Sequence, residues 1–165
     1  MLTACAVTST PAPGGEAQTI LREAAESGDG DVVGIVRFVD GPYGLLVVPK
    51  LHDLEPGVHA AHVHEIPDCA TDAAGTPAGA AGDHYDPAGT GVHNGPYGNG
   101  HLGDLPNLIV EADGTSRIPM LAPRLRAADL KGRALMIHAE ADLYDAHSAH
   151  AHGKGGPRMF CGVIN

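Results

Sequence analysis

The sequence predicts an all-β protein, either a sandwich or a barrel. Its apolar residues gather in short runs rich in Val, Ile and Leu, bounded by Gly, Pro, Asn or Asp turn signals. No long amphipathic helical pattern interrupts these runs, and the 165 residues suit one domain by length. Gly (23) and Pro (13) are abundant without a collagen period, which favours many turns and long ordered loops.

The expected strands follow one another along the chain. They cover residues 19–21 (the weakest), 31–39, 45–48, 58–66, 107–111, 117–121, 133–139 and 159–164. Asp113-Gly114 is a hairpin signal between two of these runs, and residues 127–131 suit a single helical turn. Two long loops remain, 67–106 and 140–157, and loops of this length in a compact domain are usually functional or disordered.

The charge of the chain excludes some partners. The formal net charge is −10, which argues against nucleic acid and against an anionic membrane surface. No run is long and apolar enough to cross a membrane as a helix. An anionic substrate would need a local positive patch, because the field of the whole molecule repels it.

The N-terminal residues 1–16 are small, polar and rich in Pro and Gly, so we expect a flexible tether before a domain at 17–165. Leu2-Thr3-Ala4-Cys5 resembles a bacterial lipoprotein cleavage site, with Cys5 as a lipid anchor to a membrane; chance is the alternative. The chain has three cysteines, and an odd count leaves one unpaired.

Seven residues of metal-ligand type stand in the central and C-terminal parts of the chain. They are His62, His64, His84, His93, His101, Asp104 and His138. Alternate residues of a strand share a face, so His62 and His64 point together. The 82–104 region contributes three imidazoles and a carboxylate, which make a complete tetrahedral zinc set. Seven ligands exceed one tetrahedral site, so the count predicts two metals that share a boundary.

These motifs resemble the bacterial periplasmic-type copper,zinc superoxide dismutases. The resemblance runs from about Val32 to Asn165. It rests on HVHE at 62–65, GDHYDP at 82–87, GVHN at 91–94, GHLGDLP at 100–106, LAPRL at 121–125, LMIHAEAD at 135–142 and PRMFCGVI at 157–164. It implies a Greek-key β-barrel or sandwich of immunoglobulin-like architecture, with about eight antiparallel strands and two long functional loops.

The resemblance also implies roles for individual residues. Copper would be held by His62, His64, His84 and His138, and zinc by His84, His93, His101 and Asp104, so His84 bridges the two metals. Asp142 would accept hydrogen bonds from one ligand of each metal. Arg158 would guide superoxide to copper, and Cys69 and Cys161 would form a disulfide.

The implied function is dismutation of superoxide to oxygen and hydrogen peroxide by copper redox cycling, with His84 as a proton carrier. A disulfide implies an oxidising compartment, so we expect an exported protein of the periplasm or cell envelope, a monomer or a homodimer. One alternative is a non-catalytic copper- and zinc-binding envelope protein on the same scaffold. A cupin-like enzyme is a third interpretation, but the spacing of Glu65 from the histidines is wrong for it.

The chain departs from the family in three places. Ala60-Ala61 stand where relatives usually have Gly-Phe, and His59 is interpreted as a core histidine. The loop after Cys69 lacks the steering lysine of many bacterial relatives, which leaves Lys154 and Arg158 as basic candidates. His147, His150 and His152 suggest either an auxiliary copper-capture site or a solvated loop, and the second interpretation is favoured.

Overall fold

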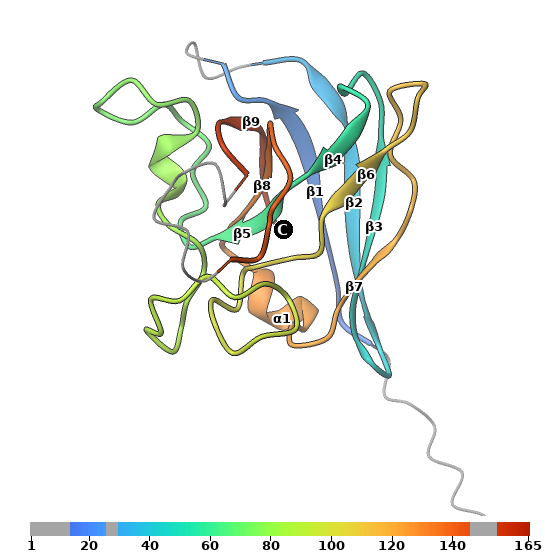
Figure 1. Ribbon diagram of the computed structural model, residues 1–165, viewed down its shortest axis with the longest axis vertical. Coiled ribbons are helices and arrows are strands. Elements are labelled where there is room, and N and C mark those ends of the chain that lie inside the picture. The colour runs from blue at the N-terminus through green and yellow to red at the C-terminus, as the bar shows by residue number, and fades with distance from the viewer. Residues whose placement is uncertain (1–13, 26–29, 146–154) are drawn as a thin grey trace, which may run out of the picture.

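A curled antiparallel sheet of seven strands is the framework of the molecule, and a two-stranded sheet lies beside it (Figure 1). The computed structural model describes residues 14–25, 30–145 and 155–165. The seven strands are ordered β5-β8-β9-β1-β2-β3-β7, and β4 pairs with β6. Their bounds are β1 Glu16–Glu23, β2 Val32–Gly41, β3 Gly44–Leu51, β4 Gly57–His59, β5 Ala61–His64, β6 Leu108–Val110, β7 Met120–Ala122, β8 Ala134–His138 and β9 Arg158–Val163. The expected all-β fold is confirmed.

Strands β1, β2 and β3 form a meander whose inner face is the core. Their side chains alternate between buried and exposed, as a sheet with one solvated face requires. Phe38 and Val47 are cross-strand partners and are fully buried, whereas Ile20 and Ile35 are partners on the outer face. A tight turn joins β2 to β3. Gly44 is required there, because its φ is 135° and a Cβ would collide with the backbone at Pro123.

Strands β5 and β8 are buried on both faces, unlike the meander. All four residues of β5 and all five of β8 are buried. Val63, Leu135 and Ile137 join the main core, while their neighbours on the strands face the long loops. The strands that carry three of the expected ligands are therefore covered by loop segments, which fix side chains on that second face.

The expected strand at 58–66 is two strands that belong to different sheets. At Ala60 the backbone leaves the β4–β6 pair and bonds the segment after β8, through Ala60 N–H to the Glu140 carbonyl and His138 N–H to the Ala60 carbonyl. β5 then pairs with β8. The sequence VHAAHVHEI at 58–66 contains no Gly, Pro, Asn or Asp turn signal, so it conceals this change of sheet.

The expected hairpin at Asp113-Gly114 is correct as a turn and wrong as a strand pair. Gly114 N–H bonds the Glu111 carbonyl, and Gly114 has a positive φ of 78°. The flanking strands pair elsewhere, however: β6 with β4, and β7 with β3. The chain after the turn crosses from one sheet to the other.

Two shorter expectations also differ in extent. The weak candidate at 19–21 is an eight-residue strand, and it begins at Glu16, the last residue of the expected tether. The single helical turn is α1, Ala127–Leu130, and a 3-10 turn at Gly79–Ala81 lies in the first long loop. Among the described residues, no helix has the length and hydropathy to span a membrane.

Candidate metal centre

Three histidines reach the centre from paired strands. His62 and His64 lie on β5, and His138 ends the neighbouring strand β8. The ring centroids of His62 and His138 are 4.8 Å apart, and those of His64 and His138 are 5.9 Å apart. The strand pairing therefore brings together side chains that are distant in the sequence.

The 82–104 loop runs along β5 and supplies the other ligands. Val63 N–H bonds the Gly103 carbonyl, and Tyr85 N–H bonds the Val63 carbonyl. Isolated bridges pair His64 with His84, and His62 with Asp104. The His84 ring centroid consequently lies 3.9 Å from that of His62 and 5.0 Å from that of His64.

Asp104 is the point where the loop histidines converge. Its Oδ1 lies 2.9 Å from Nδ1 of His84, 3.1 Å from Nδ1 of His93 and 3.4 Å from Nδ1 of His101. The Asp104 side chain has no solvent exposure. Three imidazole Nδ1 atoms around one buried carboxylate oxygen make up the donor set of a tetrahedral zinc site.

Asp142 connects the strand histidines to the loop histidines. Nε2 of His62 donates to its Oδ2 at 2.8 Å, and Nε2 of His93 donates to its Oδ1 at 2.8 Å. Asp142 is held in turn by Asn107, whose side chain bonds both the N–H and the carbonyl of Asp142, and by the N–H of Tyr144. The predicted contact with two ligand histidines is thus present.

The unpartnered polar atoms mark where cations fit. Among the described residues, six buried side-chain nitrogen or oxygen atoms lack a hydrogen-bond partner, and five of them belong to this cluster. They are Nδ1 of His62, His93 and His101, and Nε2 of His64 and His138. Burying so many unpaired groups is costly unless a ligand completes them. The donor set therefore fits metal ions.

Two overlapping groups of ligand atoms within 4.8 Å of one another occur in the described residues: His62, His64, His84, His138, and His62, His84, His93, Asp104. The first is the set expected for copper. The second contains His62 in place of the expected His101. His101 lies beside this group, with its Nδ1 3.4 Å from Oδ1 of Asp104.

The strand histidines His62, His64 and His138 differ from His93 in their affinity for protons. Burial lowers the pKa of His62, lowers that of His64 to about 2, and lowers that of His138 to about 4. Burial also opposes protonation of His93, but the nearby Asp104 carboxylate and the hydrogen bond to Asp142 outweigh it and raise the pKa to about 9. At neutral pH the strand histidines are neutral, while His93 carries a proton that a metal must displace.

Arg158 begins β9 and lies at the edge of the first long loop. Its guanidinium donates to the carbonyls of Ala78 (2.6 Å) and Gly82 (2.7 Å). The Gly82 carbonyl also accepts from Nδ1 of His64 at 2.9 Å. One backbone oxygen therefore fixes both the arginine and a histidine of the cluster. Partial burial lowers the pKa of Arg158, while the negative charges of the neighbouring Asp83 and Asp72 act in the opposite direction.

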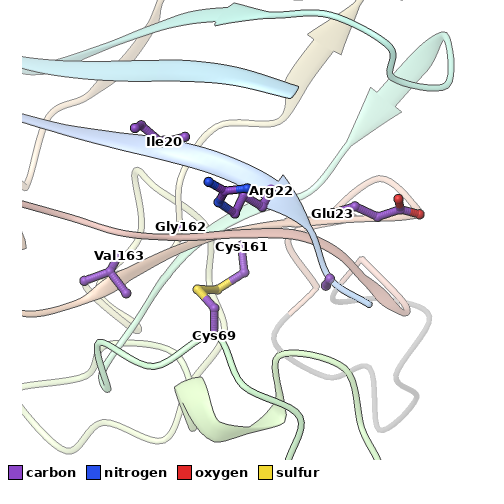
Figure 2. A pocket seen from close by; sticks show the side chains of 8 residues that line it. Ile20, Arg22, Glu23, Cys69, Cys161, Gly162 and Val163 are labelled. Carbon is purple, nitrogen blue, oxygen red and sulfur yellow. A yellow bond between two sulfur atoms is a disulfide. The ribbon is translucent and has the colours of Figure 1, made fainter. Parts of the chain in front are cut away.

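The expected disulfide between Cys69 and Cys161 is confirmed, with Cα atoms 5.7 Å apart. Figure 2 shows it joining the first long loop to β9, beside a hollow of about 240 Å³ that Arg22 and Gly162 help to line. Cys161 is 3% exposed and packs with Met136 and Ala134 of β8. The bond thus ties the loop that carries Gly82 to the strand that begins with Arg158.

Some expected functional residues lie outside the part of the chain that the structure describes: Cys5, His147, His150, His152 and Lys154. Other residues that support the centre were not singled out from the sequence. Asn107 and Arg124 both lie beside or within family motifs, and that position is the signal that could have identified them. His59 is a buried core histidine, as expected, and bonds the carbonyls of His138 and Glu55.

The fold and the centre together define a β-barrel metalloprotein with two adjacent metal sites. The model of the copper/zinc superoxide dismutase family matches residues 32–164. The superoxide dismutase [Cu-Zn] of Legionella pneumophila is 47% identical over 132 residues, which are 80% of this chain and 77% of that one. Superoxide dismutase [Cu-Zn] 1 of Salmonella typhimurium is 46% identical over 149 residues, 87% of this chain and 84% of the relative.

Solved structures agree with the sequence relatives. The Cu/Zn superoxide dismutase from Brucella abortus superposes with a TM-score of 0.86 at 42% identity, covering 92% of this chain and 100% of that one. The chain belongs to the copper/zinc superoxide dismutase family, and it is an oxidoreductase that uses copper and zinc.

Proposed function

We propose that the enzyme dismutates superoxide at a copper site formed by His62, His64, His84 and His138, next to a zinc site formed by His84, His93, His101 and Asp104. The convergence of unpartnered nitrogens supports this assignment most strongly. In each of His62, His64 and His138, one nitrogen has a fixed protein partner and the other is free for metal. Fixed partners of this kind set the tautomer and the ring orientation of metal-binding histidines.

A bound copper ion would supply reversible one-electron chemistry for superoxide, whereas zinc would supply charge without redox chemistry. His84 stands between the two groups of ligands, with Nδ1 toward Asp104 and its ring against His62 and His64. Its Nε2 is therefore the atom that can hold and release a proton on the copper side, while Nδ1 keeps the ring in place.

Arg158 supplies the local positive charge that the net charge of −10 makes necessary. Its two bonds to the Ala78 and Gly82 carbonyls hold the guanidinium in one position without neutralising it. An anion that approaches the His64 side of the centre meets this group. We assign Arg158 to guiding and orienting superoxide, as a charged donor that is already in place before the substrate arrives.

The disulfide and the bacterial relatives are consistent with an exported, periplasmic-type protein. We further propose that the residues ahead of β1 form a tether that Cys5 anchors through a lipid, with the catalytic domain beginning at β1. The mass of the mature protein purified from bacterial membranes tests the anchor. A soluble product without lipid on Cys5 would reject it. One solved relative, from Salmonella enterica, is described as monomeric, and a homodimer is the other state to test by light scattering.

Two ligand variants test the assignment of the metals. His138→Ala should lose copper and dismutation but keep zinc, because it touches only the strand side of the centre. His101→Ala should lose zinc first, because its Nδ1 faces Asp104. Metal analysis and a superoxide assay on the same samples measure both. Full copper and zinc in the wild type without dismutation would contradict the proposed activity and favour a non-catalytic binding protein, which the family membership and the intact ligand set do not favour.

A further inference from the structure

Arg124 donates hydrogen bonds to four backbone carbonyls of one loop. Nε bonds the carbonyl of Pro96 at 3.0 Å, and Nη1 bonds that of Gly100 at 3.0 Å. Nη2 bonds the carbonyls of Gly95, at 3.2 Å, and His101. A guanidinium has a planar fork of five N–H donors, so one side chain can hold both ends of the segment 95–101.

The arginine itself is fixed to the barrel. It lies just after β7, and the neighbouring Leu125 is 1% exposed within the main core. The backbone at Pro123 packs so closely on β3 that a Cβ at Gly44 would collide with it. The Arg124 side chain therefore fixes the 95–101 loop relative to the barrel. No residue of that loop belongs to the main hydrophobic core.

The loop that Arg124 holds carries two of the proposed zinc ligands. His93 comes two residues before Gly95, and His101 offers its own carbonyl to Arg124. A backbone bond from His101 N–H to the Val92 carbonyl closes the loop. The strand histidines have other supports, namely Asp142, Gly82 and Gly156. Loss of the Arg124 contacts should therefore affect zinc more than copper.

Charge and geometry predict opposite effects of Arg124 on zinc. A permanent cation near a Zn²⁺ site repels the metal, so removing the charge alone should strengthen zinc binding. A fork that holds His93 and His101 in place strengthens binding, because an ordered ligand set loses less entropy when the metal arrives. The four convergent hydrogen bonds indicate that the geometric effect is the larger.

We infer that Arg124 is a positioning residue for zinc, which presets His93 and His101 through the backbone of residues 95–101. The inference rests on the proposed zinc ligands. It assigns Arg124 no contact with superoxide and no part in the electron transfer.

The inference is tested by measuring the zinc affinity of the metal-free protein, with its disulfide intact, in competition with a chelator. R124Q removes the charge and the fork, whereas R124K keeps the charge and loses the fork. Both should weaken zinc binding by about tenfold to a hundredfold, the range for supports of metal ligands, and leave copper affinity within about twofold. R126Q is the matched control, because Arg126 lies two residues away, is exposed, and directs its side chain to the Leu125 carbonyl instead of the 95–101 segment.

Cobalt provides a second measurement of the same site. Co²⁺ bound in place of zinc should show altered visible absorption bands in R124K but not in R126Q, because the bands depend on ligand geometry. If the metal-free form of a variant is unstable, the rise in its melting temperature on adding zinc can be measured instead. This rise reports zinc affinity, because zinc stabilises the folded state that binds it.

Each outcome decides between stated alternatives. Unchanged zinc affinity in both Arg124 variants, or tighter zinc binding in R124Q, would overturn the inference. His101→Ala serves as the reference. If it abolishes zinc binding while the Arg124 variants do not, the positioning role is wrong and the proposed zinc site stands. If His101→Ala itself leaves zinc binding unchanged, the ligand assignment is wrong.

Discussion

At the scale of single residues, Gly155 shows how closely the centre is packed. It lies near the end of the second long loop and has a positive φ of 95°. A Cβ at this position would lie 2.7 Å from the Cβ of His138 and would also collide with Ala60. The carbonyl of the next residue, Gly156, accepts the hydrogen bond from Nδ1 of His138 at 3.0 Å. The backbone of these two glycines thus packs against His138 and fixes the orientation of its ring.

Gly155→Ala should therefore weaken copper binding by about tenfold or more, because His138 must move away from the new methyl group. Gly132→Ala is the matched control: Gly132 also has a positive φ, 74°, but a Cβ added to it would have no atom within 4 Å. The control should lose about 1 kcal/mol of stability from backbone strain alone and keep its copper affinity. Equal copper affinity in the two variants would refute the steric account.

The same scale shows what the sequence leaves open. The residue types and their spacing predict the seven ligands, because imidazoles together with a carboxylate are the donors that zinc and copper sites use. They do not predict which nitrogen of each histidine is free. That choice depends on partners such as the Gly82 and Gly156 carbonyls, which are backbone atoms of loops and carry no sequence signal.

At the scale of elements, the disulfide decides how the first long loop meets β9. Cys69 and Cys161 are separated by 92 residues, and the chain-entropy model gives about 4–5 kcal/mol for a loop of that length. The loop that it ties down carries Gly82, whose carbonyl bonds both Arg158 and His64. The crosslink therefore acts on the copper side of the centre, through a single backbone oxygen.

Replacing both cysteines by serine should lower the free energy of unfolding by about 4–5 kcal/mol and reduce copper affinity more than zinc affinity. Urea denaturation and competition with metal chelators measure the two effects. Zinc affinity is the internal control, because the proposed zinc ligands His93 and His101 are supported by Asp142 and the 95–101 segment rather than by Gly82. An equal loss of both metals would show that the disulfide acts on the whole fold.

Element boundaries were predictable only where the local pattern alone determines them. The partly alternating run at 31–39 locates β2 within two residues at each end, because each residue there faces either solvent or the core, whereas the apolar run at 45–48 marks only part of β3. The run at 58–66 could not be divided from its sequence, because it contains no turn signal and the change of sheet at Ala60 depends on the distant Glu140 carbonyl. The prediction of a hairpin at Gly114 was wrong for a similar reason: a turn signal does not specify which strands pair after the turn.

At the scale of the whole molecule, the buried histidines make stability depend on pH in opposite directions. His138 has a pKa of about 4 in the folded protein because burial disfavours its charged form. Its folded pKa lies below the unfolded value of 6.5, so its contribution is full above pH 6.5 and is lost as pH falls toward 4. His93 behaves in the opposite way. Its folded pKa of about 9 gives a contribution that is full below pH 6.5 and is lost as pH rises through 9.

The metal-free protein should therefore be most stable near pH 6.5 and should weaken on both sides. His138 alone accounts for a loss on the order of 3 kcal/mol between pH 6.5 and 4, and His62 and His64 add to it in the same direction.

On the alkaline side, zinc should remove the decline, because the metal displaces the proton of His93 and takes over its bonds to the loop. Urea denaturation at half-unit steps from pH 4 to 9, with and without zinc, measures both limbs. A metal-free protein whose stability stays level between pH 4 and 6.5 would show that the strand histidines are not buried in the neutral form, and an alkaline limb unchanged by zinc would show that His93 is not a zinc ligand.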